Sequence, residues 1–302
     1  MNTSRASPLK IILAVDGSEH SLAAVQLVRD LPLPPGSQVT AVGVLTPRQT
    51  PHRSWLLAAL DQAQTILQGS QAKAYTGLLH GHPAKALTDY ADEHKPDLMV
   101  VGAKGLRATL GILLGGVAQQ FVEYAWWPVL VVRASYAGLR RVLLVIDGSP
   151  HSERAVGYLA QFPLPADAEV HVMHVLLPLP PPKAAAQSVP FRAEIPPLSS
   201  YEAEQRAAWQ VEIEDREGQA LLANTVGALK DSGVQATCVL TCGDAATEIL
   251  DHVRAHKIDL IVAGSRGLGA VKGWLLGSVS RKLIHYAGCS ALIVRGGSDD
   301  GS

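Results

Sequence analysis

The residues with the clearest capacity for chemistry are glycines and serines near the carboxyl end of the chain. Gly264-Ser265-Arg266-Gly267 follows an apolar run that ends at Ala263, and Gly277-Ser278-Val279-Ser280 comes after nine intervening residues. Glycines let backbone amides approach an anion without a Cβ in the way. A helix that begins at the second segment would present unpaired N–H groups to that anion. With two serine hydroxyls as further donors, the pattern predicts a phosphate-binding loop. A tight turn followed by a serine helix cap is the alternative that the loop alone leaves open.

A carboxylate at the end of an earlier apolar run belongs to the same prediction. Asp147 closes that run and is followed by Gly148-Ser149, so a local turn into the next helix is one interpretation of it. Ligands of doubly wound sheets bind beyond the carboxyl ends of the strands, where the strand order reverses. If the order is 3-2-1-4-5, the reversal lies between strands 1 and 4. Asp147 and Gly264 would then face one crevice.

The chain is an internal duplication. The segment around Asp16 recurs around Asp147, 131 residues later, and the segment ending at Gly102 recurs at Gly264, 162 residues later. The larger second offset places an insertion of 31 residues in the second copy. Prolines between 178 and 197 prevent regular structure there. We therefore expect an irregular surface insertion near 177–200, close to the carboxyl edge of the sheet, followed by a long helix over 201–230.

The elements that must position these residues follow from periodicity. In the first copy, apolar runs predict strands over 10–16, 38–45, 73–80, 97–102 and 129–133, with helix-period segments between them. This alternation is typical of a parallel sheet covered on both faces. The sequence thus predicts an α/β protein with two doubly wound, parallel five-stranded sheets. We place the two domains at 1–137 and 138–302.

The spacing Gly264-x2-Gly267-x9-Gly277-Ser278, taken with Asp147, resembles the ATP-binding signature of the universal stress proteins. Weaker similarity to that family covers nearly all of both copies. The resemblance implies a nucleotide α-hydrolase-like fold with order 3-2-1-4-5 in each domain. It also implies that the adenosine is bordered by Asp147 and Val175, the sugar is lined by Ala263 and Gly264, and the phosphates are surrounded by Arg266, Gly267, Gly277, Ser278, Val279 and Ser280.

The first copy keeps only part of this pattern. Its glycine spacing and its strand-end residues match at Asp16, Val44, Gly102, Gly105 and Gly115. Gly116 and Ala118 stand where the second copy has its two serines, and Lys104 replaces the arginine. We therefore expect a degenerate nucleotide motif in the first domain, with weaker phosphate binding or a scaffold role, and a complete motif in the second.

The family resemblance also bears on assembly. The last strands of the two copies, 129–132 and 291–294, are apolar, and exposed edges of this kind favour strand pairing. In the resembled family the equivalent strands pair across a dimer. We therefore expect the two copies to pair within one chain as a pseudo-dimer, and we leave association into a homodimer open.

Composition excludes several classes of protein. Twenty-six basic and 27 acidic side chains give a net charge of −1, which argues against a nucleic-acid binder because such a surface needs a basic field. Apolar runs fall well short of the ~20 residues of a membrane span. The polar start of the chain lacks the apolar core of a secretory signal. We therefore predict a cytoplasmic protein without membrane or nucleic-acid partners.

These observations predict an adenine-nucleotide-binding protein of stress response or signalling, with an unknown protein partner. ATP is the leading ligand, and Mg²⁺ is an optional companion of its phosphates. We expect a switch or adaptor rather than a dedicated enzyme, because the sequence carries neither a Walker loop nor a nucleophile elbow. A slow ATPase and an adaptor that binds no nucleotide remain as alternatives.

Histidines and cysteines are two further residue types that could carry chemistry. His171 and His174 would point to opposite faces of a strand, so no metal site is expected from them. The three cysteines, Cys238, Cys242 and Cys289, are expected to be free and mostly buried thiols.

Overall fold

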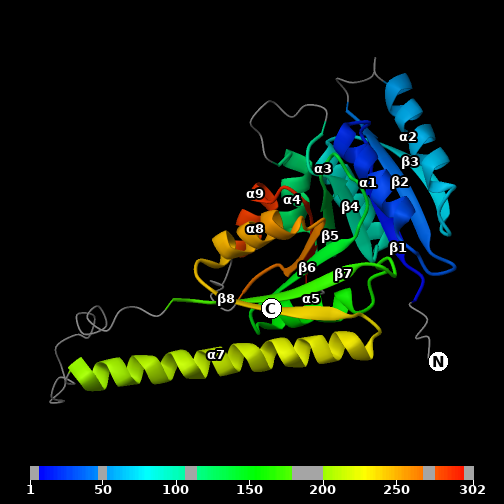
Figure 1. Cartoon of the computed structure of the whole chain (residues 1–302). Coiled ribbons are helices and arrows are strands. Elements are labelled where there is room, and N and C mark those ends of the chain that lie inside the picture. Colours follow the sequence, from blue (N-terminus) through cyan, green and yellow to red (C-terminus); the bar gives the residue numbers. More distant parts are fainter. Residues whose placement is uncertain (1–6, 47–52, 106–113, 179–199, 268–275, 296–302) are drawn as a thin grey trace.

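The computed structural model describes residues 7–46, 53–105, 114–178, 200–267 and 276–295. These residues form one ten-stranded sheet in the order β3-β2-β1-β4-β5-β10-β9-β6-β7-β8. Helices cover both of its faces (Figure 1). The proline-rich insertion lies mostly in 179–199, outside the described residues.

The first half contains four helices and five strands among its described residues. In chain order they are β1 (Lys10–Ala14), α1 (Glu19–Asp30), β2 (Gln38–Leu45), α2 (Arg53–Leu67), β3 (Lys73–His80), α3 (Pro83–His94), β4 (Leu98–Gly102), α4 (Gly116–Tyr124) and β5 (Val129–Val132). Two of the expected strands, 38–45 and 73–80, have the bounds that periodicity predicted.

The second half repeats this succession. Its elements are β6 (Arg141–Ile146), α5 (Pro150–Leu159), β7 (Glu169–Leu176), α7 (Ser200–Asp231), β8 (Ala236–Cys242), α8 (Ala245–His256), β9 (Leu260–Gly264), α9 (Ser278–Tyr286) and β10 (Ser290–Val294). Each half has the order 3-2-1-4-5, counted along its own strands, and all pairings within a half are parallel. The predicted fold class is confirmed.

The two halves meet through their last strands. β5 and β10 pair in an antiparallel manner, with Ala291 opposite Val131 and Ile293 opposite Val129. Two arginines reinforce this seam in a reciprocal way. Arg133 donates to the carbonyl of Ile284 over 2.7 Å, near the end of α9, and Arg295 donates to carbonyls near the end of α4. The expected intrachain pairing of the two copies is therefore confirmed.

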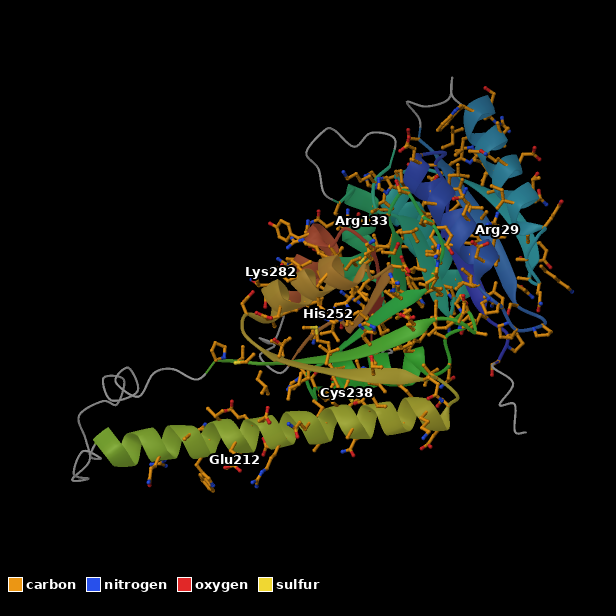
Figure 2. All side chains as sticks on the ribbon, viewed as in Figure 1. Arg29, Arg133, Glu212, Cys238, His252 and Lys282 are labelled. Atoms are coloured by element: carbon orange, nitrogen blue, oxygen red, sulfur yellow. The ribbon has the colours of Figure 1, made fainter. Side chains whose placement is uncertain are left out.

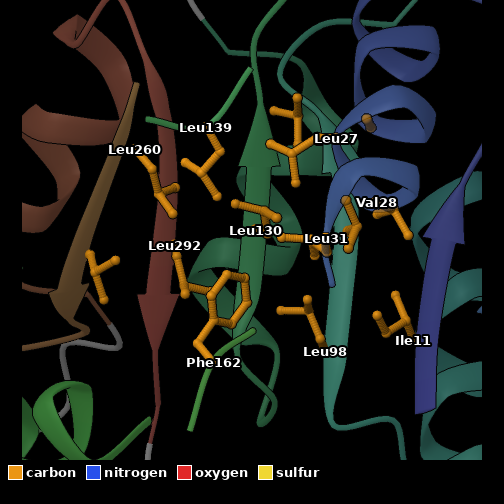
Figure 3. Close-up of a cluster of buried hydrophobic side chains, with 14 of the residues drawn as sticks. Ile11, Leu27, Val28, Leu31, Leu98, Leu130, Leu139, Phe162, Leu260 and Leu292 are labelled. Atoms are coloured by element: carbon orange, nitrogen blue, oxygen red, sulfur yellow. The ribbon is translucent and has the colours of Figure 1, made fainter. Parts of the chain in front are cut away.

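Apolar composition explains which strands are central. All residues of β5, β9 and β10 are buried, whereas the edge strands β3 and β8 carry exposed positions. On one face, α1, α2, α5 and α7 pack over a continuous hydrophobic cluster that crosses the seam. Figure 3 shows Leu130 and Leu292 side by side in this cluster, with Leu98 and Phe162 nearby. The two halves thus share one core on this face.

The long helix α7 is the main departure from the internal symmetry. It has 32 residues and packs on β7 and β8 through buried Leu222 and Leu229. Its amino-terminal part extends past the sheet, where Trp209 is 65% exposed (Figure 1). Even this helix is not apolar enough to cross a membrane, and neither is any other helix in the described ranges.

The cysteines differ in part from the expectation. All three are unpaired, but Cys238 and Cys242 are exposed. The expectation of mostly buried thiols was wrong because β8 is an edge strand whose central residues are only partly covered. Burial raises the pKa of the Cys289 thiol to about 12.

Candidate functional site

The strand order reverses at two equivalent places, between β1 and β4 and between β6 and β9. Doubly wound sheets bind ligands at such reversals, in the crevice beyond the carboxyl ends of the strands. In the second half, Asp147 Oδ1 accepts a hydrogen bond from the amide of Ser149 over 3.0 Å, across Gly148 with φ of 75°. Ser149 in turn caps α5 by accepting from the amide of Ser152. The local turn that Asp147 suggested is therefore present, and it fixes the direction of the carboxylate.

The same carboxylate lies against the glycine loop. A Cβ on Gly267 would overlap Asp147 Oδ2, so only glycine fits here without movement. A Cβ on Gly264 would lie 2.5 Å from the carbonyl oxygen of His151, where α5 crosses the end of β9. These close approaches explain both glycines physically. They also bring the strand-1 aspartate and the loop together, as the predicted strand order required.

The loop closes onto the start of α9. The amide of Gly277 donates to the carbonyl of Ser265 over 2.8 Å, which brings the two ends of the loop together. α9 then begins at Ser278 without a side-chain hydrogen bond from its cap residue, Gly277. A helix start of this kind leaves backbone N–H groups for an anion.

The two serines of α9 occupy different environments. Ser280 is buried, and its hydroxyl donates to the carbonyl of Gly264 over 2.8 Å. Ser278 is exposed at the first position of the helix. A hydroxyl has one proton to donate, and Ser280 uses its proton to hold the end of β9 in place. Ser278 is therefore the serine of the pair whose hydroxyl is exposed.

Positive charge gathers beside this loop. Arg266 Nε is buried and has no hydrogen-bond partner among the described residues. Burial, and then the nearby charge of Arg266, lowers the pKa of Arg295 to about 10. An anion near these two guanidinium groups would favour the charged form of Arg295.

The first half repeats the contact between the strand-end aspartate and the glycine loop, and a cavity lies beside it. Asp16 Oδ1 accepts from the amide of Ser18 over 3.0 Å, and a Cβ on Gly105 would lie 2.6 Å from Asp16 Oδ2. The cavity beside them has a volume of about 910 Å³. Its lining includes all five residues that the sequence assigned to this half, namely Asp16, Val44, Gly102, Gly105 and Gly115. The first half thus has space for a ligand, although residues without a hydroxyl stand at its two serine positions.

Helices α2 and α3 supply the walls that sequence reasoning missed. Trp55 and Leu56 from α2, and Pro83 and Leu87 from α3, line the cavity. The Trp55 ring covers Gly17, so that a Cβ there would overlap the ring. An aromatic residue near the start of a helix after strand 2 was the available signal, but periodicity does not show which way a side chain turns.

His20 borders the first crevice without joining it. Its Nδ1 accepts from the amide of Ala134 over 2.7 Å, and a Cβ on Gly102 would meet its backbone. Burial, and then the charge of Lys104, lowers the pKa of His20. Its Nδ1 acts as an acceptor that fixes the chain after β5.

Comparison with known proteins agrees with this geometry. The model of the universal stress protein family matches residues 9–133 and 138–295. A universal stress protein of Mycolicibacterium smegmatis is 26% identical over 96% of this chain and 98% of its own length. Universal stress protein YxiE of Bacillus subtilis is 30% identical, with 51% of this chain and 98% of its own length covered.

A solved structure extends the comparison to the fold. A universal stress protein from Archaeoglobus fulgidus superposes with a TM-score of 0.66 at 17% identity, covering 96% of this chain and 97% of that one. The likeness spans both halves and so includes the tandem arrangement. Since the family model matches nearly the whole chain in two successive copies, the protein belongs to the universal stress protein family and carries its domain twice.

Proposed function

We propose that this protein binds adenine nucleotide in its two crevices and serves in stress response as a nucleotide-dependent switch or adaptor. The observation that carries the proposal is the convergence, in each half, of a strand-end aspartate, a glycine loop and an uncapped helix start. A volume of about 910 Å³ in the first half lies within the range of ligand pockets, roughly 300 to 1,000 Å³.

The proposed roles are those that the family resemblance implies, adjusted for the hydrogen bond of Ser280. Asp147 and Val175 border the adenosine in the second half, and Ala263 and Gly264 line the sugar. The phosphates lie at the start of α9, near Arg266, Gly267, Gly277, Ser278 and Val279, while Ser280 positions the end of β9 through its bond to Gly264. In the first half, Asp16 and Val44 take the adenosine positions, and the glycines face the phosphates without a serine hydroxyl.

We propose ATP as the ligand with the highest affinity, because a triphosphate extends from the sugar toward the helix start. Mg²⁺, when present, would be held mainly by phosphate oxygens, as this ion commonly is. Occupancy is the signal in a switch, whereas an enzyme requires turnover. The second domain, 138–302, is proposed to bind more tightly than the first, 1–137, because only it offers Ser278.

The direct test is mass spectrometry of small molecules released from gently purified protein, followed by incubation with ATP and measurement of ADP. We expect a retained adenine nucleotide and no turnover beyond the rate of ATP alone. Retained nucleotide with turnover would favour the slow ATPase. If no adenine nucleotide is retained and none binds on addition, the proposal is wrong and the adaptor alternative stands.

A further inference from the structure

Three imidazoles from two elements meet on one face of the second half. His171 lies on β7, and His252 and His256 lie one turn apart on α8 (Figure 2 labels His252). Each residue offers a ring nitrogen, and these nitrogens all lie within 4.8 Å of one another. His171 Nδ1 is 2.9 Å from His252 Nε2, and the rings of His252 and His256 stack with centroids 4.1 Å apart.

These separations suit a tetrahedral metal ion. Zn²⁺ binds imidazole nitrogen at about 2.0 to 2.1 Å, so two nitrogens of a tetrahedron lie about 3.3 Å apart. The observed range, from 2.9 Å to at most 4.8 Å, includes this value. Rotation of the rings would therefore bring three nitrogens around one ion.

The surroundings leave room for a fourth ligand. A second cavity, of about 420 Å³, is lined by His171 and His256 together with Arg141, Glu169 and Lys257. Glu169 favours a cation, and so does the carboxyl end of α8, where His256 is the last residue. Arg141 and Lys257 oppose a cation and limit its affinity. Arg141 Nε lies 3.5 Å from Glu169 Oε2, so the carboxylate partly offsets the charge of this arginine.

The first half provides an internal comparison. At the positions equivalent to His171, His252 and His256 it carries Thr40, Tyr90 and His94. Tyr90 and His94 stack with ring centroids 3.9 Å apart, so the same ring packing is achieved there with a tyrosine. Packing alone therefore does not require three histidines at this place. The difference between the halves is in ligand chemistry.

We propose that His171, His252 and His256 form a site for a divalent transition-metal ion, with Zn²⁺ as the reference ion and the fourth position open to solvent. Imidazole ligands suit Zn²⁺, Cu²⁺, Ni²⁺ and Co²⁺ better than the oxygen-seeking Mg²⁺. The ion would join β7 to α8 and stabilise the outer part of the second half.

This site is separate from the proposed nucleotide crevice. His171 is four residues before Val175 on β7, a distance of about 13 Å along the strand. It lies toward the amino ends of the strands, whereas the crevice lies beyond their carboxyl ends. The metal proposal therefore does not depend on nucleotide binding.

Sequence reasoning missed the site because it compared His171 only with His174. The two do face opposite sides, since His171 contacts α8 and His174 lies against Gly218 on α7. The spacing of four residues between His252 and His256 was an available signal. What periodicity could not show was that α8 crosses the sheet at β7.

The test uses residues that this fold already accommodates in its other half. The full-length protein is freed of metal, and Zn²⁺ binding is measured by equilibrium dialysis, with Co²⁺ absorption as a probe of tetrahedral geometry. His171→Thr and His252→Tyr introduce the first-half residues. Loss of an outer hydrogen-bond partner of a metal site typically costs about 10- to 100-fold in affinity, so loss of a direct ligand is expected to cost more than about 100-fold.

Two control variants identify other sources of binding. His94→Gln removes the equivalent histidine of the first half, and Cys238→Ser/Cys242→Ser removes the exposed thiols. Both should bind one Zn²⁺ as the unmodified protein does, with tetrahedral Co²⁺ bands. If a histidine variant fails to fold by circular dichroism, the exposed His256→Gln replaces it. The proposal is overturned if the unmodified protein binds no Zn²⁺, or if folded histidine variants bind it equally well.

Discussion

The same substitution at the two serines near the start of α9 should affect different properties of the protein, namely ATP affinity at Ser278 and stability at Ser280. Ser278→Ala removes an exposed hydroxyl at the proposed phosphate position. A hydrogen bond to a charged group contributes about 1.5 to 3 kcal/mol, or roughly 10- to 100-fold in affinity. Water can replace part of this, so we expect about tenfold weaker ATP binding. Because the side chain is exposed, the unfolding temperature should not change.

Ser280→Ala should instead reduce stability. It removes the 2.8 Å bond to Gly264 and leaves that carbonyl without its buried donor, which costs about 1 to 3 kcal/mol. The equivalent residue of the first half is a buried alanine, so the fold tolerates the change. We expect the unfolding temperature to fall by about 2 °C or more, with ATP affinity changed by less than about threefold, which is under 1 kcal/mol.

Calorimetric titration with ATP and differential scanning calorimetry without nucleotide measure the two effects separately. The matched pair controls itself, since both variants lose one hydroxyl from the same helix turn. Our account of the crevice is refuted if Ser280→Ala weakens ATP binding as much as Ser278→Ala and leaves the unfolding temperature unchanged.

Three further outcomes are expected. Gly116→Ser adds a hydroxyl where the first half lacks one, and a Cβ there meets no heavy atom within 4 Å. ATP titration should show that the affinity of the weaker site rises by up to about tenfold, and an unchanged affinity would contradict the proposed role of the serine. Leu130→Ala opens the core at the seam and should lower the free energy of unfolding by about 2 to 5 kcal/mol. Calorimetry should show one unfolding transition moving to lower temperature, because both halves contribute to that core. Separate unfolding of the two halves would count against a shared core. Iodoacetamide should label Cys238 and Cys242 quickly and Cys289 only after unfolding, because the thiolate is the reactive form and burial raises the pKa of Cys289 to about 12. Mass spectrometry measures the labelling, and equal labelling of all three cysteines in the folded protein would disprove this expectation.

Much of the fold could be predicted from local pattern because the chain presents each element twice. Apolar runs located the strands, and the repeat confirmed them. The errors at strand ends have local causes. β1 ends at Ala14 and not at Asp16, because Asp16 lies in a turn where its side chain accepts a hydrogen bond from the amide of Ser18. β4 begins at Leu98, where Asp97 Oδ2 accepts from the amide of Lys10.

The sites were less predictable because they depend on which side chains meet. The glycine spacing placed Gly267 in the crevice region, and the structure gives the reason in its contact with Asp147. No spacing rule shows that Ser280 donates to Gly264, or that Trp55 covers Gly17. Such contacts depend on rotamers and on how α2 and α9 lie over the sheet. The first-half cavity was not predicted for the same reason, since lost hydroxyls say nothing of the space beside them.

We propose that both crevices accept an adenine nucleotide and that the second binds it more tightly. The most direct measurement is calorimetric titration of ATP into full-length protein from which bound nucleotide has been removed, with GTP as the comparison. We predict two binding events of unequal affinity for ATP and weaker binding of GTP. Absence of ATP binding, or two sites of equal affinity that Ser278→Ala leaves unchanged, would contradict the account.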